Sequence, residues 1–285
     1  MSLKNELNKL NNEMTNNPFE QHEIKHLSAS SINTYIADPC LFVLRYLYKH
    51  RSPSNPAMWR GTIVDESIGR SLGWVKTKKK DKIVWVNKKK KISDKEVQRQ
   101  AINQFDGLHK HYLKEKVDVD ETKAKREKSL IPFYLDAALP FYKELDKPLD
   151  YQKEINLQFD DLPIPIIGFI DLQYDGIVRD VKTTGRLPSV MPSAVARQLS
   201  IYAVAENSTP IADYIYATKS KNEVVSMFVD DVDFHIATVR KVANTIMNLL
   251  SYSNDVKQIA DLFYPNFDDW RWSKTDIETA KKLWR

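Results

Sequence analysis

One stretch, GFIDLQYDGIVRDVKTT at residues 168–184, constrains this chain more than any other feature. Asp175-Gly176 at its centre is a strong two-residue hairpin signal, because Asp and Gly tolerate the positive φ values of such turns. If these residues form the loop, Asp171 lies directly opposite Asp180, and Phe169 lies opposite Lys182. Like charges in opposed positions weaken a hairpin. The charged face is therefore either solvated or built to hold something positive.

The opposed aspartates have a spacing that suits a metal ion. Directly opposed Cβ atoms lie ~4.5–5.5 Å apart, which lets two carboxylates bind one hard cation through oxygen atoms at ~2.0–2.6 Å. The other face of the hairpin is apolar except for Arg179, and we expect it to face the core. Its members are Ile170, Leu172, Tyr174, Ile177 and Val181.

Two polar residues in the following helical segment, ARQLSIYAVA, bear on this choice. Gln198 and Tyr202 are four residues apart, so they share one face of a helix. Polar groups on a helix packed over a sheet need partners, and the charged face of the hairpin can supply them. The alternative is that both are ordinary residues at the helix boundary.

Charge is concentrated in a second stretch, KTKKKDKIVWVNKKKK at 76–91, within a chain of 285 residues and formal net charge +5. Two β-like pieces around KKKDK predict a protruding basic hairpin over residues 73–91. One interpretation is a solvated loop. The other is a finger that follows DNA phosphates while Trp74 or Trp85 stacks on a base. Its candidate DNA-binding residues are Lys78, Lys79, Lys80, Lys82, Trp85, Lys88, Lys89, Lys90 and Lys91.

The order of elements predicts an α/β fold. We expect β-strands at 151–159, 163–174, 177–183, 212–218 and 223–229, and helices at 27–48, 61–73, 94–115, 130–146, 191–206 and 231–253. This order favours a central mixed sheet flanked by helices, with an N-terminal helical portion. The absence of long apolar runs and of a signal-peptide core predicts a cytoplasmic protein that does not enter membranes. The single cysteine, Cys40, predicts a buried reduced thiol.

Four motifs in order resemble the PD-(D/E)XK nuclease superfamily, in its RecB-like branch, which includes phage and mitochondrial exonucleases. They are G-x-x-D at 168–171, D-x-K at 180–182, Q-x-x-x-Y at 198–202, and the helix LSASSINTYIADPCLFVLRYLY at 27–48. GTIVDES and YPNFDDWRW resemble further elements of the family. The resemblance implies a restriction-endonuclease-like core. It divides the chain into a flexible lead-in (1–26) and one nuclease domain (27–285), with a helical portion (27–149), a catalytic sheet (150–230) and a C-terminal helix and tail (231–285).

The resemblance also implies roles for individual residues. Asp171 and Asp180 would be metal ligands, with the Val181 carbonyl completing the shell, and Lys182 would activate water or stabilise charge on the phosphate. Gln198 and Tyr202 would hold Lys182 and the DNA backbone. Glu154 is either a further ligand or a surface strand residue. The serines that begin the helix at 27–48, positions 29 and 31 (Ser31), would contact DNA.

This sequence departs from the family's pattern in two places. Asp65 stands where many relatives have a metal-binding His. It would favour Mg²⁺ while accepting Mn²⁺, or it simply solvates a helix face, with Glu66 a weaker substitute. The cysteines that hold an iron–sulfur cluster in some relatives are missing, so no cluster is expected. Trp270 and Trp272 would then join the tail to the N-terminal helix through aromatic packing.

These observations predict a divalent-metal-dependent deoxyribonuclease, an exonuclease in preference to an endonuclease, acting on single-stranded DNA or DNA ends. Phage DNA processing, recombination and repair are the expected settings, with recombination or replication proteins as candidate partners. The alternatives are a sequence- or structure-specific endonuclease, a DNA-binding module of the same fold that does not cleave, and a small-molecule metal hydrolase. The sequence leaves the oligomeric state, the polarity and the strand preference open.

Overall fold

The computed structural model describes residues 17–79, 82–88 and 92–285. The chain divides into two compact units. One comprises Met1–Ser52, Asn156–Gly168 and Asp233–Arg285, and the other comprises Pro53–Ile155 and Phe169–Val232. Lys80, Lys89, Lys90 and Lys91, assigned to DNA binding, lie outside the described residues, as do residues 1–16 of the predicted lead-in. No described helix is long and apolar enough to cross a membrane.

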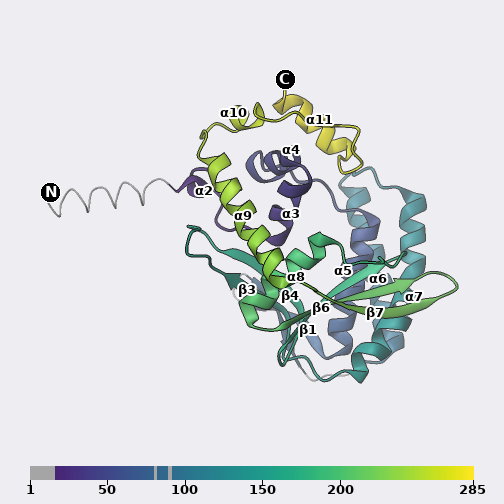
Figure 1. Ribbon diagram of the computed structural model, residues 1–285. Coiled ribbons are helices and arrows are strands. Elements are labelled where there is room, and N and C mark those ends of the chain that lie inside the picture. Colours follow the sequence, from purple (N-terminus) through teal and green to yellow (C-terminus); the bar gives the residue numbers. More distant parts are fainter. Residues whose placement is uncertain (1–16, 80–81, 89–91) are drawn as a thin grey trace. The chain divides into compact units, whose positions relative to one another are not determined.

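The second unit is built on a five-stranded sheet of order β3-β4-β5-β6-β7 (Figure 1). Its strands are β3 (Asp150–Leu157), β4 (Ile166–Tyr174), β5 (Ile177–Thr184), β6 (Thr209–Ala217) and β7 (Asn222–Phe228). β5 runs parallel to β6, whereas the β4–β5 and β6–β7 pairs are antiparallel. The predicted mixed central sheet is confirmed, and its five strands begin and end within three residues of the predicted bounds.

The hairpin β4–β5 has the predicted register. Leu172 pairs with Arg179 and Tyr174 pairs with Ile177, leaving Asp175-Gly176 as the loop. Only Gly176, at φ +65°, has a positive φ in this turn, so the expectation of two such positions is wrong. Continued by one step, this register would place Asp171 opposite Asp180, and Asp171 Oδ2 accepts a hydrogen bond from the N–H of the next residue, Val181, at 2.7 Å.

Helices cover both faces of this sheet. The core on one face is formed by α5 (Pro56–Ser71), α6 (Asp94–Lys114) and α7 (Glu121–Glu144), which pack against Leu172, Tyr174 and Ile215. Helix α7 starts nine residues before the predicted 130, because Asp120 caps its N-terminus by accepting from the Lys123 N–H. Helix α8 (Ser193–Glu206) lies against β5 and β6, where it meets Asp180 on the face opposite the α7 core.

Arg179, the one charged residue on the apolar face, has a buried partner. Its guanidinium contacts Asp213 Oδ1 at 2.7 Å, and the Tyr142 hydroxyl and Ser226 hydroxyl also donate to that carboxylate. Asp213 is fully buried, so this network satisfies an anion that would otherwise be costly in the core. The predicted core-facing character of this side of the hairpin therefore holds even at Arg179.

The first unit is mainly helical. It contains α2 (Pro18–Gln21), α3 (Ala29–Ala37), α4 (Pro39–Phe42), the π-helix η1 (Val43–Leu47), α9 (Val232–Leu250), α10 (Val256–Ala260) and α11 (Lys274–Leu283). The segment predicted as a helix at 27–48 is interrupted at Asp38, which caps α4 by accepting from the Cys40 and Leu41 N–H groups. Cys40 is a buried free thiol, as expected, and burial raises its pKa to about 12.

The C-terminal tail contacts the N-terminal helices within this unit. The Trp272 indole N–H donates to Asp38 Oδ2 at 2.8 Å, and its ring packs edge-on against Phe267. Trp270 is instead 86% exposed, so its expected role in the junction is wrong. The fully buried Asp276 also links the tail to the N-terminal segment: it accepts from Arg45 and Ser52, and from Ser273 at the start of α11.

Candidate active site

Asp180 and Lys182, alternate residues of β5, lie at the centre of the site. Lys182 Nζ is 2.6 Å from Asp180 Oδ2, and Asp180 is 1% exposed. Burial alone would lower the pKa of Lys182, but Asp180 and Asp171 together raise it above its usual value. The lysine is therefore a fixed cation. The solvated-surface interpretation of this hairpin face does not fit a carboxylate so deeply buried.

Helix α8 supplies the two polar residues that share a face. Gln198 donates from Nε2 to Asp180 Oδ1 at 3.1 Å and to the Tyr202 hydroxyl at 2.9 Å, while its Oε1 accepts from Lys182 Nζ at 3.2 Å. This amide contacts both members of the ion pair and fixes their orientation. Burial raises the pKa of Tyr202, so its hydroxyl stays neutral. Gln198 and Tyr202 are thus placed beside Asp180 and Lys182 by the one-turn spacing.

Asp171 on β4 completes the pair of hairpin aspartates. Its Oδ2 accepts from the Val181 N–H at 2.7 Å and its Oδ1 from Gln152 Nε2 at 2.8 Å. Burial and the charge of Asp180 raise the pKa of Asp171 to about 7, although Lys182 opposes the shift. Burial also raises the pKa of Asp180. The Val181 contact involves its N–H; ligation through its carbonyl stays a prediction.

Asp65 on α5 faces the same cluster. Its Oδ2 accepts from the Tyr151 hydroxyl at 3.0 Å and from Gln152 Nε2 at 2.9 Å. Its Oδ1 is buried and accepts no hydrogen bond from any described residue. Burial first, and then the charge of Asp171, raise the pKa of Asp65 well above its usual value. A half-buried carboxylate in these surroundings is not simply solvating a helix face.

Sequence reasoning missed Gln152, which joins Asp65 to Asp171 through one amide nitrogen. Gln152 has φ +53°, a left-handed conformation inside strand β3 that is uncommon for any residue with a side chain. Strand alternation places Gln152 on the same face as Glu154, but nothing in the sequence signals the positive φ or the two hydrogen bonds. Glu154 is exposed, and whether it serves as a ligand stays a prediction.

Glu66, the weaker substitute considered for the missing His, has other partners. It is buried, forms an ion pair with Lys76 of the basic hairpin, and accepts from Gln104 at 2.7 Å. Its side chain also lies 3.5 Å from Arg70. These contacts make Glu66 a structural anchor between α5, α6 and the hairpin, and Asp65 is the residue of α5 that reaches the aspartate cluster.

The basic hairpin consists of β1 (Trp74–Lys79) and β2 (Lys82–Asn87). Lys78, Lys79, Lys82 and Lys88 are exposed. Trp74 is 7% exposed, so stacking of a base on Trp74 is ruled out. Trp85 is half-buried and packs at 87° against the Tyr151 ring, with Lys76 Nζ 5.3 Å from its centroid. The hairpin is therefore anchored to the sheet through Tyr151.

The serines assigned to DNA binding lie in the first unit. Position 29 is Ala29, which is 8% exposed and has no hydroxyl group, so its assignment is wrong. Ser31 is 2% exposed and forms a capping box with Ser28 at the start of α3. A buried hydroxyl engaged in a helix cap is not available to a phosphate.

The carboxylate oxygens of Asp65, Asp171 and Asp180 are ligands that suit a hard divalent cation, but the described residues are not arranged in metal-binding geometry. No three of their carboxylate, imidazole or thiolate groups meet the geometry of a metal-binding cluster. The reason is visible in the hydrogen bonds: Gln152, the Val181 N–H and Lys182 already contact Asp65, Asp171 and Asp180. Burial is the main cause of the raised pKa values of all three aspartates, and Asp65 Oδ1 accepts no hydrogen bond from a described residue; a cation placed among them would stabilise their charged forms.

Of the comparisons with known proteins, the family model agrees with this geometry. A solved structure titled "Crystal structure of SSO0001" is 19% identical, with a TM-score of 0.27, over 35% of this chain and 49% of that chain, so the match spans about half of its length. No curated protein matches the chain. The family model of the PD-(D/E)XK nuclease superfamily matches residues 26–268. Nucleases of this superfamily generally use divalent metal ions, and this chain belongs to the PD-(D/E)XK nuclease superfamily.

Proposed function

We propose that this protein is a deoxyribonuclease of the RecB-like branch that cleaves phosphodiester bonds with Mg²⁺ or Mn²⁺. The observation that carries the proposal is the contact set around Asp180 and Lys182. A buried carboxylate, a fixed ammonium group and an amide that touches both lie beside two further carboxylates. An ordinary charged surface does not bury such groups.

Asp171 and Asp180 would hold the cation from adjacent strands, with Asp65 contributing from α5. A bound divalent ion supplies Lewis-acid stabilisation of the phosphate and lowers the pKa of bound water. The Gln152 amide donates to both Asp65 and Asp171, so it would have to turn away for these carboxylates to hold a cation. Oxygen ligands alone suit Mg²⁺ and Mn²⁺ better than softer ions.

Lys182 acts as a positive charge beside the reacting phosphate. Since its pKa is raised by Asp180 and Asp171, it stays protonated at neutral pH. A fixed ammonium stabilises charge that develops on the phosphate oxygens. Gln198 keeps its Nζ close to Asp180, and Tyr202 holds the Gln198 amide in turn. In this arrangement, Lys182 is an electrostatic stabiliser in preference to a general base.

The basic hairpin would attract the DNA backbone. Lys78, Lys79, Lys82 and Lys88 are exposed on an element anchored beside β3. Phosphate contacts of this kind give affinity without sequence information. We therefore favour an exonuclease, in recombination, repair or phage DNA processing, over a sequence-specific endonuclease.

Digestion of end-labelled DNA tests this proposal. Linear and covalently closed circular DNA are incubated with Mg²⁺, with Mn²⁺ or with EDTA. The proposal predicts release of short products from linear DNA with either metal and none with EDTA. Cleavage of closed circles at the same rate would contradict the exonuclease assignment, and metal-independent cleavage would contradict the mechanism.

A further inference from the structure

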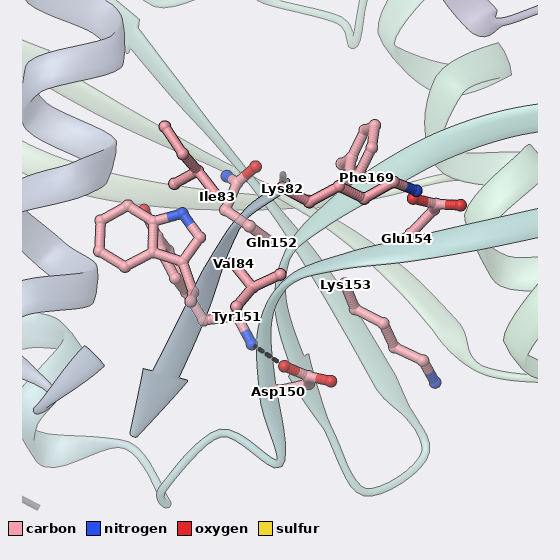
Figure 2. Close-up of a pocket in the computed structure, with 10 residues that line it drawn as sticks. Lys82, Ile83, Val84, Asp150, Tyr151, Gln152, Lys153, Glu154 and Phe169 are labelled. Atoms are coloured by element: carbon pink, nitrogen blue, oxygen red, sulfur yellow. Dashed lines mark hydrogen bonds between the residues drawn. The ribbon is translucent and has the colours of Figure 1, made fainter. Parts of the chain in front are cut away.

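A pocket of about 680 Å³ lies between the basic hairpin and the sheet, within the second unit. Lys82–Trp85 of β2, Asp150–Glu154 of β3 and Phe169 of β4 line it (Figure 2). Its volume is typical of a site for a small ligand. Gln152 belongs both to this lining and to the hydrogen bonds with Asp65 and Asp171. The pocket therefore borders directly on the candidate catalytic carboxylates.

Two walls of the pocket expose apolar side chains to solvent. Ile83 is 71% exposed and Phe169 is 49% exposed. In Figure 2, Ile83, Gln152 and Phe169 lie toward one end of the pocket, and Asp150 lies toward the other. Phe169 precedes Asp171 by two residues, so both side chains leave the same face of β4. An aromatic ring thus stands next to a candidate metal ligand.

Charge near the pocket indicates what kind of ligand it suits. Lys82 lines the pocket, and Lys78, Lys79 and Lys88 are exposed on the same hairpin. Two acidic residues also line the pocket: Asp150 accepts from the Tyr151 N–H at 2.8 Å, and Glu154 is exposed. The second lining lysine, Lys153, is paired with Glu206 on α8, so the unpaired positive charge comes from the hairpin. Exposed cations beside an exposed aromatic ring match a polyanion that carries flat apolar groups, which describes a nucleic acid strand.

We propose that this pocket receives an unpaired base of single-stranded DNA, stacked on Phe169 and flanked by Ile83, next to the phosphate to be cleaved. This inference rests on the proposed nuclease function and names its substrate class. A base within a duplex is stacked on both faces and paired at its edge, so it must leave the helix before it can enter. The lysines of the hairpin then hold the adjoining phosphates.

Equilibrium binding in EDTA, where no cleavage occurs, tests the pocket apart from catalysis. Fluorescence anisotropy is measured with a labelled single strand, with the same strand carrying consecutive abasic sites, and with a blunt duplex. The variants are Phe169→Ala and Ile83→Ser. Phe228→Ala is the matched control, because Phe228 is a 60% exposed aromatic on β7, outside the pocket lining.

The proposal predicts that Phe169→Ala weakens binding of the normal single strand by about tenfold or more, as loss of one base–aromatic stack does. Phe228→Ala should leave it unchanged. The wild type should bind the abasic strand as weakly as Phe169→Ala binds the normal strand. Phe169→Ala should bind the abasic strand no more weakly than that, because the base–ring contact is lost only once. Duplex binding should change by less than about twofold in either pocket variant.

Equal loss of single-strand and duplex binding, or no loss with Phe169→Ala, would overturn the proposal. So would equal affinity of the wild type for normal and abasic strands, which would indicate that the pocket serves another ligand, such as a protein segment. Cleavage measured separately with Mn²⁺ distinguishes the two claims. Cleavage without base-dependent binding would support the proposed nuclease function and contradict the base pocket. Base-dependent binding without cleavage would support the base pocket and contradict the nuclease function.

Discussion

At the scale of single residues, Asp171 has a carboxylate that folding makes harder to ionise. Its pKa is raised to about 7, chiefly by burial and then by Asp180. The folded state therefore holds a proton that the unfolded state has already released, and stability falls as pH rises from about 4 to about 7. Charge at this position costs the metal-free protein stability at neutral pH.

Relative to its effect at pH 4, where the wild-type carboxyl is protonated, we expect Asp171→Asn to raise the melting temperature of the metal-free protein at pH 8 by a few degrees. The amide has one acceptor oxygen for the two donors of Asp171, so a loss that does not depend on pH is subtracted from this gain at every pH. Differential scanning fluorimetry in EDTA from pH 4 to 8 measures it. Asp175→Asn in the hairpin turn is the control, since Asp175 is exposed. A gain that does not depend on pH would show that charge is not its cause.

Gln152 supplies hydrogen bonds to two carboxylates at once. Gln152→Leu removes both; Asp65 Oδ2 keeps the Tyr151 hydroxyl, but Asp171 Oδ1 loses its donor, so we expect a loss of about 1–3 kcal/mol in the free energy of unfolding. Urea denaturation measures it. Gln98→Leu is the control, because Gln98 makes an exposed hydrogen bond to Asp136, and surface changes usually stay within about 0.5 kcal/mol. Equal effects of the two substitutions would contradict the role given to Gln152.

At the scale of elements, the close approach of α5 to Tyr151 places Asp65. A Cβ atom added at Gly69 would lie 2.5 Å from the Tyr151 ring, which is closer than real contacts. This ring in turn packs against Trp74 and Trp85 of the basic hairpin. Gly69 thus permits one aromatic residue to connect α5, the hairpin and the candidate site.

We expect Gly69→Ala to destabilise the protein by about 1–3 kcal/mol, because overpacking forces the ring or the helix to shift. Gly107→Ala in α6 is the control: its added Cβ meets nothing within 4 Å, and alanine favours a helix by about 1 kcal/mol. Thermal denaturation of both variants checks this. The idea fails if the two substitutions change the melting temperature in the same direction.

Patterns between residues close in the sequence predicted part of the secondary structure and of the site. The hairpin register follows from Asp175-Gly176, and the joint placement of Gln198 and Tyr202 follows from helical spacing. The start of α7 at Glu121 did not follow, since its first turns are polar and only the Asp120 cap marks the boundary. The Gln152 contacts did not follow either, because a positive φ at a non-glycine strand residue has no sequence signature.

At the scale of the whole molecule, positive charge is concentrated on one element of a chain with net charge +5. We expect Lys78→Glu with Lys79→Glu to weaken DNA binding and to reduce its dependence on salt, because fewer counterions are released. Anisotropy titrations between 50 and 300 mM salt measure the slope. Lys281→Glu with Lys282→Glu on α11 is the control for net charge. Equal effects of the two pairs would assign binding to overall charge and not to the hairpin.

The residues that join the C-terminal tail to the N-terminal segment, within the first unit, could be predicted only in part from the sequence. The missing cysteines predicted aromatic packing between the tail and the N-terminal helix, but Trp272 reaches Asp38 through a hydrogen bond, and its ring packs against Phe267 of the tail itself. The buried Asp276 adds hydrogen bonds from Arg45 and Ser52, which are more than 200 residues away in sequence. Such long-range pairs of common residue types cannot be recognised in one sequence.

The central claim is that Asp180 and Lys182 carry out metal-dependent cleavage of DNA. The most direct test is the cleavage rate of end-labelled single-stranded DNA with Mn²⁺ by the wild type, by Asp180→Asn, by Lys182→Ala and by the control Asp175→Asn, with circular dichroism as the check on folding. Loss of one catalytic group typically costs 10²-fold or more. We predict a loss of at least about this size in the first two variants and wild-type activity in the control. Undiminished cleavage by folded Asp180→Asn and Lys182→Ala would contradict the account.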